Sequence, residues 1–491
     1  MRNVTFMMAG ALMLGMGGVL LEGRAADKPN VIIILADDLG YADVGFQGLG
    51  DIPTPNLDRL ASAGVRCTSG YVCWTACSPS RAGLITGQDP HRFGFYDNPN
   101  PILAANQGLP PGIMTIPRAL QQQGYVTAGI GKWHLGTTPD RHPNRMGFTE
   151  WYGFLGGGHE YFPRDTYTTW NKGAKTKYPQ RPWPEWFVNH TLPLVRNSDP
   201  VKTQRYLTDE FTREAVSFIK RHPQNPFFLY LSYNAPHSPY EVPEDEEALL
   251  DVNKMAKVPG VTAAQRRTYA AMITRLDKGV GEVLATLKAS GLEEKTIIFF
   301  LSDNGGGHSG PGYYSSNHPL RGYKGDLYEG GIRVPFVVNW KGNLPAGSVY
   351  QHPVTSLDIG ATALALAGGA PAPMKLDGVN LVPFISGQRK EPPHERVCVK
   401  RQGLGMVREG RYKLITGVGK RAQELYDVES DLGETKNLAA ENPDLARRLD
   451  AAWQTWNAEM APPLWKPVPE KEWKRPEYQP PLMPDELAVQ P

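Results

Sequence analysis

Five short and continuously apolar segments constrain this chain more than any other feature. Runs of this length, without polar alternation, are typical of strands that helices cover on both faces of a sheet. Helical patterns lie between these runs, and the alternation predicts an α/β domain with a large, mostly parallel sheet sandwiched by helices. The predicted strands are residues 31–36 (VIIILA), 125–131 (YVTAGIG), 226–233 (PFFLYLSY), 296–302 (TIIFFLS) and 334–340 (VPFVVNW).

Two segments between these strands have the pattern of amphipathic helices. In residues 54–64, Thr54 can cap the helix, Pro55 suits its first position and Gly64 suits its end. In residues 207–222, apolar side chains recur at helical spacing and share one face. We expect both helices to cover the sheet.

The pattern of apolar and polar residues changes after residue 375. Residues 403–417 and 423–429 alternate as antiparallel strands do, and residues 442–460 repeat apolar side chains at helical spacing before a Pro-rich tail begins. The predicted units are an α/β domain at residues 26–375 and a smaller C-terminal α+β domain, with its tail, at residues 376–491.

Residues 1–25 have the pattern of a secretory signal peptide. Arg2 precedes an uncharged stretch, and small residues stand at Gly23 and Ala25. A membrane anchor is the alternative, but four glycines weaken a spanning helix, and no second apolar stretch of membrane length follows. We expect cleavage, export to the periplasm or beyond the cell, and no stable membrane insertion.

The charges of the chain are nearly balanced. Lys and Arg total 52 against 50 for Asp and Glu, and no basic block indicates a nucleic-acid partner. An anionic substrate would therefore need a local cluster of cations.

The four cysteines are too few for a disulfide framework in a chain of this length. Cys67 and Cys73 are near enough in sequence to pair in an oxidising compartment. Cys398 lies in a strand-like run, where a buried thiol is expected. Cys77 remains, at the head of the segment CSPSRAGLITG.

Polar residues follow the predicted strands directly, at the edge where parallel sheets bind ligands. Asp37 and Asp38 follow the first strand, and Asp303 and Asn304 follow the fourth. Three carboxylates and an amide oxygen suit a hard cation such as Ca²⁺ or Mg²⁺. Turn formation explains either pair alone, but two such pairs after two strong strands favour a metal site.

Basic side chains occur near the same strand ends. Arg81, Lys132 and Lys324 would suit the oxygens of a sulfate or phosphate group. His134 and His237 can exchange protons near neutral pH. Each of these residues alone is more often part of a surface turn, so only their combination predicts a site for a tetrahedral oxyanion.

The segment CSPSRAGLITG, residues 77–87, matches the signature of the formylglycine-dependent type I sulfatases: Cys-x-Pro-Ser-Arg followed by a short helix that ends in Thr-Gly. Further blocks resemble that family in the same order, over nearly the whole chain after the predicted signal. They are KPNVIIILADDLGYADVG, TPNLDRLASAGV, GYVTAGIGKWHLG, SDNGG, KGDLYEGGIRVP and MVREGRYKLI followed by ELYDVESDLGETKNLA. The resemblance implies the fold of the alkaline-phosphatase superfamily.

The resemblance also implies a maturation step and a set of roles. A formylglycine-generating enzyme would oxidise Cys77 to Cα-formylglycine, whose hydrated aldehyde attacks sulfur and later expels sulfate. The implied ligands of a Ca²⁺ ion, with Mg²⁺ as the alternative, are Asp37, Asp38, Asp303, Asn304 and residue 77 itself. The implied catalytic side chains are Arg81 and Lys132 for orienting the nucleophile, Asp303 and His134 for accepting protons, and His237 and Lys324 for the leaving group.

Two loop segments resemble carbohydrate sulfatases that act on galactose or N-acetylgalactosamine sulfates more than steroid or aryl sulfatases. They are residues 86–100 and 142–165. We predict exo-acting hydrolysis of a sulfated glycan, at position 4 or 6. The predicted sugar contacts, each of which also suits a structural loop residue, are His91, Arg92, Asp97, His159 and Arg164.

Three other functions stay open. One is an arylsulfatase of broad specificity, and another is a phosphodiesterase or phosphonate monoester hydrolase of the same superfamily. A single metal site, with lysines where a second metal would lie, favours sulfate over phosphate. The third is an exported glycan-binding protein with an unmodified Cys77, against which the full set of site residues argues.

Overall fold

The computed structural model describes residues 28–99, 107–162, 192–307, 313–417 and 423–466. The predicted signal peptide at residues 1–25 lies outside the described residues, as do Arg164 and most of the Pro-rich tail. Within the described ranges, no helix is both long and apolar enough to cross a membrane.

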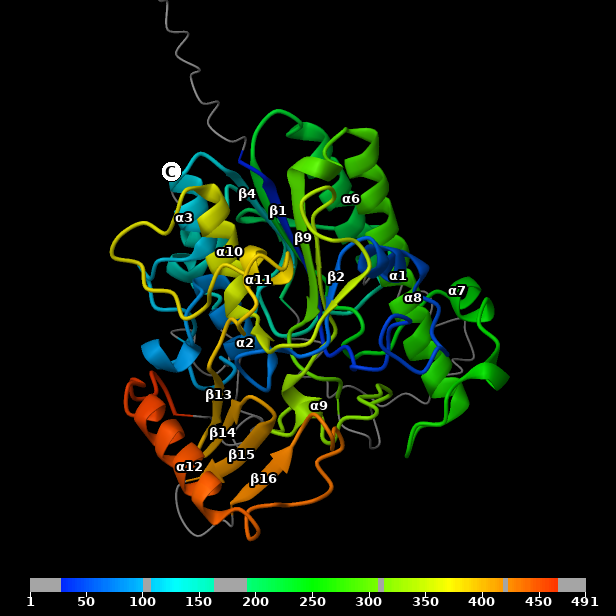
Figure 1. The fold of residues 1–491 in the computed structure, drawn as a ribbon. Helices are drawn as coiled ribbons and strands as arrows, with labels where there is room; N and C mark the ends of the chain where they lie inside the picture. Colours follow the sequence, from blue (N-terminus) through cyan, green and yellow to red (C-terminus); the bar gives the residue numbers. More distant parts are fainter. Residues whose placement is uncertain (1–27, 100–106, 163–191, 308–312, 418–422, 467–491) are drawn as a thin grey trace, which may run out of the picture.

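A mixed sheet of ten strands forms the centre of the described structure (Figure 1). Its strands are β1 (Asn30–Ala36), β2 (Val65–Cys67), β4 (Val126–Lys132), β5 (Glu150–Phe154), β6 (Leu194–Arg196), β7 (Asp199–Val201), β8 (Phe227–Ser232), β9 (Thr296–Ser302), β10 (Phe336–Asn339) and β11 (Ser348–Tyr350). Their order is β11-β2-β10-β9-β1-β8-β4-β5-β6-β7. A short pair, β3 (Gly70–Tyr71) and β12 (Val354–Thr355), lies beside this sheet.

Four of the five predicted strands form the parallel centre of this sheet, as β9, β1, β8 and β4. The fifth, β10, is antiparallel to β9, so the sheet is less uniformly parallel than its apolar runs indicate. Only the short helix α9 (Glu329–Ile332) precedes β10. A parallel return needs a long crossover, usually a helix, whereas an antiparallel return does not.

Two layers of helices cover the sheet (Figure 1). On one face lie α1 (Pro55–Ser62), α6 (Leu207–Arg221) and α8 (Ala263–Ala289), which share a core with Ile32 and Ile34 of β1. On the other face lie α2 (Cys77–Thr86), α3 (Ile116–Gln122) and α10 (Leu357–Ala367), which pack against Val31 and Ile33. Both predicted helices are confirmed, as α1 with proline at its start and as α6. The short helix α7 (Glu244–Ala248) packs against α8, and the short helix α11 (Val382–Ile385) contributes Ile385 to the core that α10 shares.

A second, antiparallel sheet follows in the C-terminal part. It consists of β13 (Arg396–Arg401), β14 (Leu404–Glu409), β15 (Tyr412–Gly417) and β16 (Glu424–Asp427), and α12 (Pro443–Asn457) packs on one face. Val399 and Met406, on the other face, belong to the core of the large domain. The small domain is therefore joined to the large one through apolar packing.

Candidate active site

The segment CSPSRAGLITG forms helix α2, which begins at Cys77 and is buried along its whole length. Cys77 and Arg81 are four residues apart, so they lie on one face of the helix. Gly83 is required by packing, because a Cβ at this position would lie 2.3 Å from the Sγ atom of Cys73. Gly87 ends the helix with a φ of 68°.

The polar residues that follow the parallel strands in sequence lie together at one edge of the sheet. Ala36 at the end of β1 pairs with Ser302 at the end of β9, so Asp37 and Asp303 follow at the same level. Lys132 is the last residue of β4, two strands away. The sheet therefore assembles the residues whose positions after strands predict a ligand site.

Two fully buried cations neutralise the deepest carboxylates. The Nη2 atom of Arg81 lies 2.8 Å from Oδ2 of Asp303 and 3.6 Å from Oδ1 of Asp37. The Nζ atom of Lys132 lies 2.6 Å from Oδ2 of Asp37. Moving either carboxylate away from its cation would leave a buried charge uncompensated, which is costly. The ion pairs therefore hold both carboxylates in one orientation.

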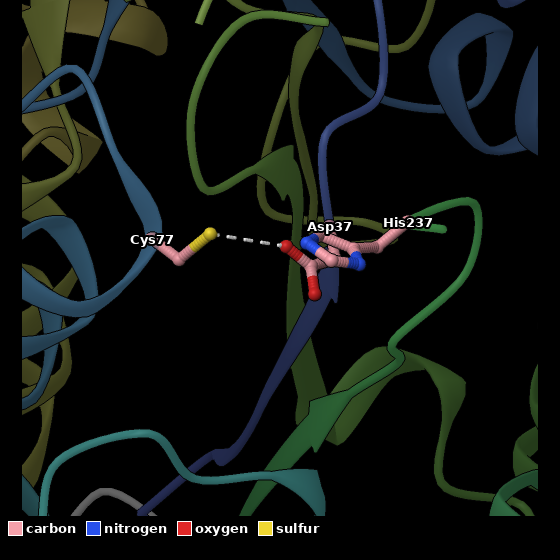
Figure 2. Close-up of side chains that lie close together, drawn as sticks. All are labelled: Asp37, Cys77 and His237. Carbon is pink, nitrogen blue, oxygen red and sulfur yellow. Dashed lines mark hydrogen bonds between the residues drawn. The ribbon is translucent and has the colours of Figure 1, made fainter. Parts of the chain in front are cut away.

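Cys77 lies between the carboxylates and a third cation. Its thiol donates to Oδ1 of Asp37 at 3.5 Å (Figure 2), and the Nζ atom of Lys324 approaches its Sγ atom at 3.0 Å. The same Nζ atom lies 2.7 Å from Oδ1 of Asp38. Burial raises the pKa of Cys77 to about 12 in spite of the nearby lysines. The unmodified side chain is therefore a thiol at neutral pH, and a thiol is a weak nucleophile.

The same carboxylates fit a hard divalent cation. Asp37, Asp38, Cys77 and Asp303 each offer a ligand atom, and these atoms lie within 4.8 Å of one another. The Oδ1 atom of Asn304 is buried and has no hydrogen-bond partner among the described residues, while its Nδ2 atom donates to Asp38 at 2.7 Å. A buried carbonyl oxygen without a partner is costly, and a cation in this cluster would satisfy it. Oxygen donors of this kind suit Ca²⁺ or Mg²⁺.

The carboxyl groups of the cluster differ in acidity. Burial alone would raise the pKa of Asp37, but the charges of Lys132, His237 and Arg81 hold it far below its usual range. For Asp303, burial and the charge of Asp37 prevail and raise the pKa to about 6. A buried acid with a raised pKa, beside ionised neighbours, is a candidate proton acceptor.

Two histidines face the cluster from separate loops. The Nε2 atom of His237 lies 3.7 Å from Oδ2 of Asp38, and its Nδ1 atom is 2.6 Å from the carbonyl oxygen of Ser238. The Nδ1 atom of His134 is buried, and none of the described residues forms a hydrogen bond with it. Burial and the charge of Lys132 hold the pKa of His134 well below its usual range. This ring is therefore neutral at pH 7 and can accept a proton.

Known proteins are similar to this chain in sequence and in fold. The sequence model of the Sulfatase family matches residues 29–370, and a model described as N-sulphoglucosamine sulphohydrolase, C-terminal, matches residues 323–454. The chain belongs to the sulfatase family. It is a sulfuric ester hydrolase with a large, mostly parallel sheet and a C-terminal antiparallel sheet.

Individual relatives extend the comparison. N-acetylgalactosamine-6-sulfatase of Canis lupus familiaris is 34% identical over 398 residues, which cover 78% of this sulfatase and 70% of the relative. The uncharacterized sulfatase YdeN of Escherichia coli (strain K12) is 29% identical, over 90% of this chain and 88% of its own. The solved structure of Ps i-CgsB in complex with k-i-k-neocarrahexaose is 37% identical, with a TM-score of 0.79, and the match covers 91% of this chain and 96% of that one.

Of the sugar contacts predicted for the sulfatase, His91 needs correction. Its ring is fully buried, its Nδ1 atom lies 2.6 Å from Oδ1 of Asp89, and it packs edge-on against Tyr96. Because Asp89 and Tyr96 occupy its ring, His91 supports a loop instead. Arg92 binds two carboxylates, Asp377 and Glu459.

Two other predicted sugar contacts, Asp97 and His159, lie near residues of the site. Asp97 is half-buried and is followed by Asn98, whose Oδ1 atom accepts from the backbone nitrogen of Ser78 at 3.1 Å. The carbonyl oxygen of His159 lies 3.5 Å from Nδ2 of Asn234, in the loop that carries His237. Both residues therefore border the site. Tryptophan rings often stack on sugars, but Trp151 is a core residue, and Trp170, Trp183 and Trp186 lie outside the described residues.

Some structural partners in the sulfatase site were not predicted from the sequence. Ser232 and Tyr230 of β8 accept hydrogen bonds from Nη1 of Arg81, at 2.5 and 3.5 Å. Their positions at the end of a predicted strand were the available signal. Cys67 and Cys73, which are near enough in sequence to pair, are both free and buried in the core.

Proposed function

We propose that this sulfatase removes sulfate from a galactose or N-acetylgalactosamine unit of a sulfated glycan, with Cys77 matured to formylglycine. The observation that carries the proposal is the position of the Cys77 Sγ atom, 3.0 Å from Nζ of Lys324 and 3.5 Å from Oδ1 of Asp37. Any nucleophile built at this position lies beside both the carboxylate cluster and a cation.

Asp37, Asp38, Asp303 and Asn304 would hold a Ca²⁺ ion, with Mg²⁺ as the alternative. When bound, the ion would withdraw charge from the sulfate group and so stabilise the transition state. Arg81 and Lys132 would keep these carboxylates ionised and oriented through their buried ion pairs. The cluster would thereby bind a sulfate ester in one fixed orientation.

A hydrated formylglycine at position 77 would supply a hydroxyl group that attacks sulfur, and a second hydroxyl group whose deprotonation releases the sulfate. Asp303 would accept the first proton, because its pKa of about 6 lies nearest to neutrality among the three carboxyl groups. His134 would accept the second proton at its unpartnered Nδ1 atom. His237 and Lys324, on the side of Asp38, would meet the leaving oxygen.

Two comparisons favour a galacto-configured glycan. A relative at 34% identity is named N-acetylgalactosamine-6-sulfatase, and the structure at 37% identity holds a neocarrahexaose. We retain Arg92, Asp97, His159 and Arg164 as proposed sugar contacts, and export and a formylglycine-generating enzyme as parts of the proposal. A structural likeness to the phosphonate monoester hydrolase SpPMH, at 20% identity and a TM-score of 0.63, extends to the fold alone.

Peptide mass spectrometry tests the maturation of Cys77. Cys67, Cys73 and Cys77 lie in one tryptic peptide, residues 67–81, so fragmentation must locate the change. We expect a loss of about 18 Da at Cys77 alone, as an aldehyde oxygen replaces the thiol. An intact thiol in fully active protein would contradict the proposed nucleophile.

Release of inorganic sulfate tests the substrate class. We expect the parent protein to hydrolyse N-acetylgalactosamine and galactose sulfates. Cys77→Ala should abolish this activity, whereas Cys398→Ala, at a cysteine in the small domain, should preserve it. Turnover of an aryl sulfate without any turnover of sulfated sugars would favour a broad arylsulfatase. Faster turnover of the matched phosphate esters would favour a phosphoryl-transfer enzyme.

A further inference from the structure

A cavity of about 640 Å³ lies where the two domains meet, outside the carboxylate cluster. Tyr96 of the large domain and Lys400 and Gln402 of the small domain line it, together with residues 460–463 and Trp465 beyond α12. Most of its wall is aromatic, proline and aliphatic carbon, and few polar groups face it. Ligand sites commonly combine an apolar lining with a few placed polar groups.

The walls of this cavity are held in place without a ligand. The hydroxyl of Tyr96 donates to the carbonyl oxygen of Ala461 at 2.9 Å, and the backbone nitrogen of Leu464 donates to that of Gly94 at 2.8 Å. Trp465 packs edge-on against Phe95, with ring centroids 4.9 Å apart. Such a preformed wall lowers the entropy lost on binding.

The charge of the cavity comes from Lys400. Its Nζ atom lies 3.2 Å from the hydroxyl oxygen of Tyr96 and 5.0 Å from the centre of that ring. Within the described residues, the close contacts of the Lys400 Nζ atom are those with Tyr96, and Asp89, the carboxylate whose charge acts on it, lies 2.6 Å from the His91 ring. Burial lowers the pKa of Lys400. A half-buried cation whose close contacts are with a phenol suits an anionic ligand.

The cavity is close to the reaction site on two sides. A Cβ atom at Gly325, the neighbour of Lys324, would lie 3.5 Å from Nη2 of Arg401. Tyr96 is two residues from Asn98, which holds the backbone nitrogen of Ser78 at the start of α2. Two residues span at most about 7 Å. The cavity is therefore within reach of a unit attached to the reacting sugar.

We propose that this cavity is a subsite for the sugar next to the one that loses its sulfate, and that Lys400 binds a sulfate group carried by that neighbouring sugar. The inference rests on the proposed function. Arg401, whose guanidinium group approaches Gly325, would meet the charges of a sugar chain that ran from the cavity toward Lys324. The consequence is a preference for oligosaccharides with more than one sulfate over sulfated monosaccharides.

Binding measured by calorimetry on the Cys77→Ala protein tests this subsite without turnover. The probes are k-i-k-neocarrahexaose and galactose 6-sulfate, each with Lys400 intact, with Lys400→Gln and with Lys400→Arg. We expect Lys400→Gln to weaken binding of the hexaose about 10-fold or more, because a charge-assisted contact is lost. Lys400→Arg should retain most of the affinity, and neither change should affect the monosaccharide.

A matched control is Lys436→Gln, which removes an equal charge from an exposed ion pair with Glu441 in the same domain. Its hexaose affinity should be that of the parent. Equal weakening of both probes by Lys400→Gln would overturn the subsite, as would a hexaose that binds no better than the monosaccharide. A third outcome separates the two proposals. If hexaose binding depends on Lys400 but the parent protein, with Cys77 intact, hydrolyses no sulfated sugar, the subsite is supported and the proposed function is refuted.

Discussion

Individual residues of the site occupy backbone conformations that side chains seldom adopt. Asp38 and His134 both have a φ of 60°, in the left-handed region. For residues other than glycine this conformation costs about 1–2 kcal/mol. Both residues follow central strands, and the turn at Asp38 places its Oδ1 atom 3.8 Å from the Sγ atom of Cys77. The backbone strain at these two residues therefore lowers the stability of the fold, and the packing of the core compensates for it.

Asn304 provides the residue-scale test of the metal site. We expect Ca²⁺ to raise the melting temperature of the parent protein, since a ligand at about 100 times its Kd stabilises by about 2.7 kcal/mol. Asn304→Ala should remove more than half of this gain, because the unpartnered Oδ1 atom is lost. The readout is differential scanning calorimetry with and without Ca²⁺.

The control for this experiment is Asn339→Ala. Asn339 is also buried, and its amide donates to the carbonyl oxygen of Leu60 at 3.2 Å, away from the cluster. This variant should lose stability but keep the full response to Ca²⁺. An unchanged response in Asn304→Ala would contradict the assignment of its oxygen as a ligand.

At the scale of elements, one carboxylate ties helix α10 to the segment that leads into the small domain. Asp358 is buried in the first turn of α10 and accepts from the backbone nitrogens of Thr355 and Val379 at 2.7 and 2.9 Å. It also lies 2.9 Å from Nε2 of His394, just before β13. α10 packs directly against α2, so this junction supports the helix that carries Cys77.

The contact between His394 and Asp358 predicts that the stability of the protein depends on pH. Burial opposes a charge on His394, but the hydrogen bond and charge of Asp358 prevail and raise its pKa above the usual 6.5. The folded state therefore binds the proton more tightly than the unfolded state. The contribution, on the order of 1 kcal/mol, should be complete below about pH 6.5 and fade as the pH rises through the folded pKa.

Urea unfolding at a series of pH values checks this expectation. His394→Gln should flatten the dependence above pH 6.5, whereas His352→Gln, at an exposed histidine, should leave it as in the parent. A parent protein whose stability rose steadily through this range would contradict the predicted sign.

At the scale of the whole molecule, a buried ionic network joins the two domains. Lys413 of β15 is fully buried, with its Nζ atom 2.9 Å from Oε1 of Glu329 in the large domain and 2.8 Å from Oε1 of Glu434. Tyr71 donates to Oε2 of Glu329 at 2.6 Å, and Arg408 of β14 donates to the same hydroxyl oxygen. The small domain is therefore fixed to the large one by charge as well as by apolar packing.

Lys413→Met should destabilise the protein by about 3–5 kcal/mol, because it leaves two buried carboxylates without their shared cation. Lys436→Met, at an exposed pair, should change the unfolding free energy by less than about 1 kcal/mol. Denaturant unfolding measures both. A loss below about 1 kcal/mol for Lys413→Met would show that the network contributes little to the domain junction.

The sequence by itself determined the elements and the chemistry that follows them. Strands such as residues 296–302 were predictable because burial on both faces leaves a continuous apolar run, which is a local signal. Asp37 and Asp303 were predictable as neighbours because parallel strands end at one edge of a sheet. Cys77 and Arg81 were predictable as partners because helical spacing places residues four apart on one face.

Only the tertiary structure decided how distant segments meet. It turned β10 antiparallel, buried His91 behind Tyr96, left Cys67 and Cys73 unpaired and brought Lys400 from the second domain to a cavity beside the site. These outcomes depend on packing and charge across hundreds of residues, for which no short-range pattern in the chain carries a signal. Periodicity reports which face of an element is buried, but the partner that buries it is chosen by the fold as a whole.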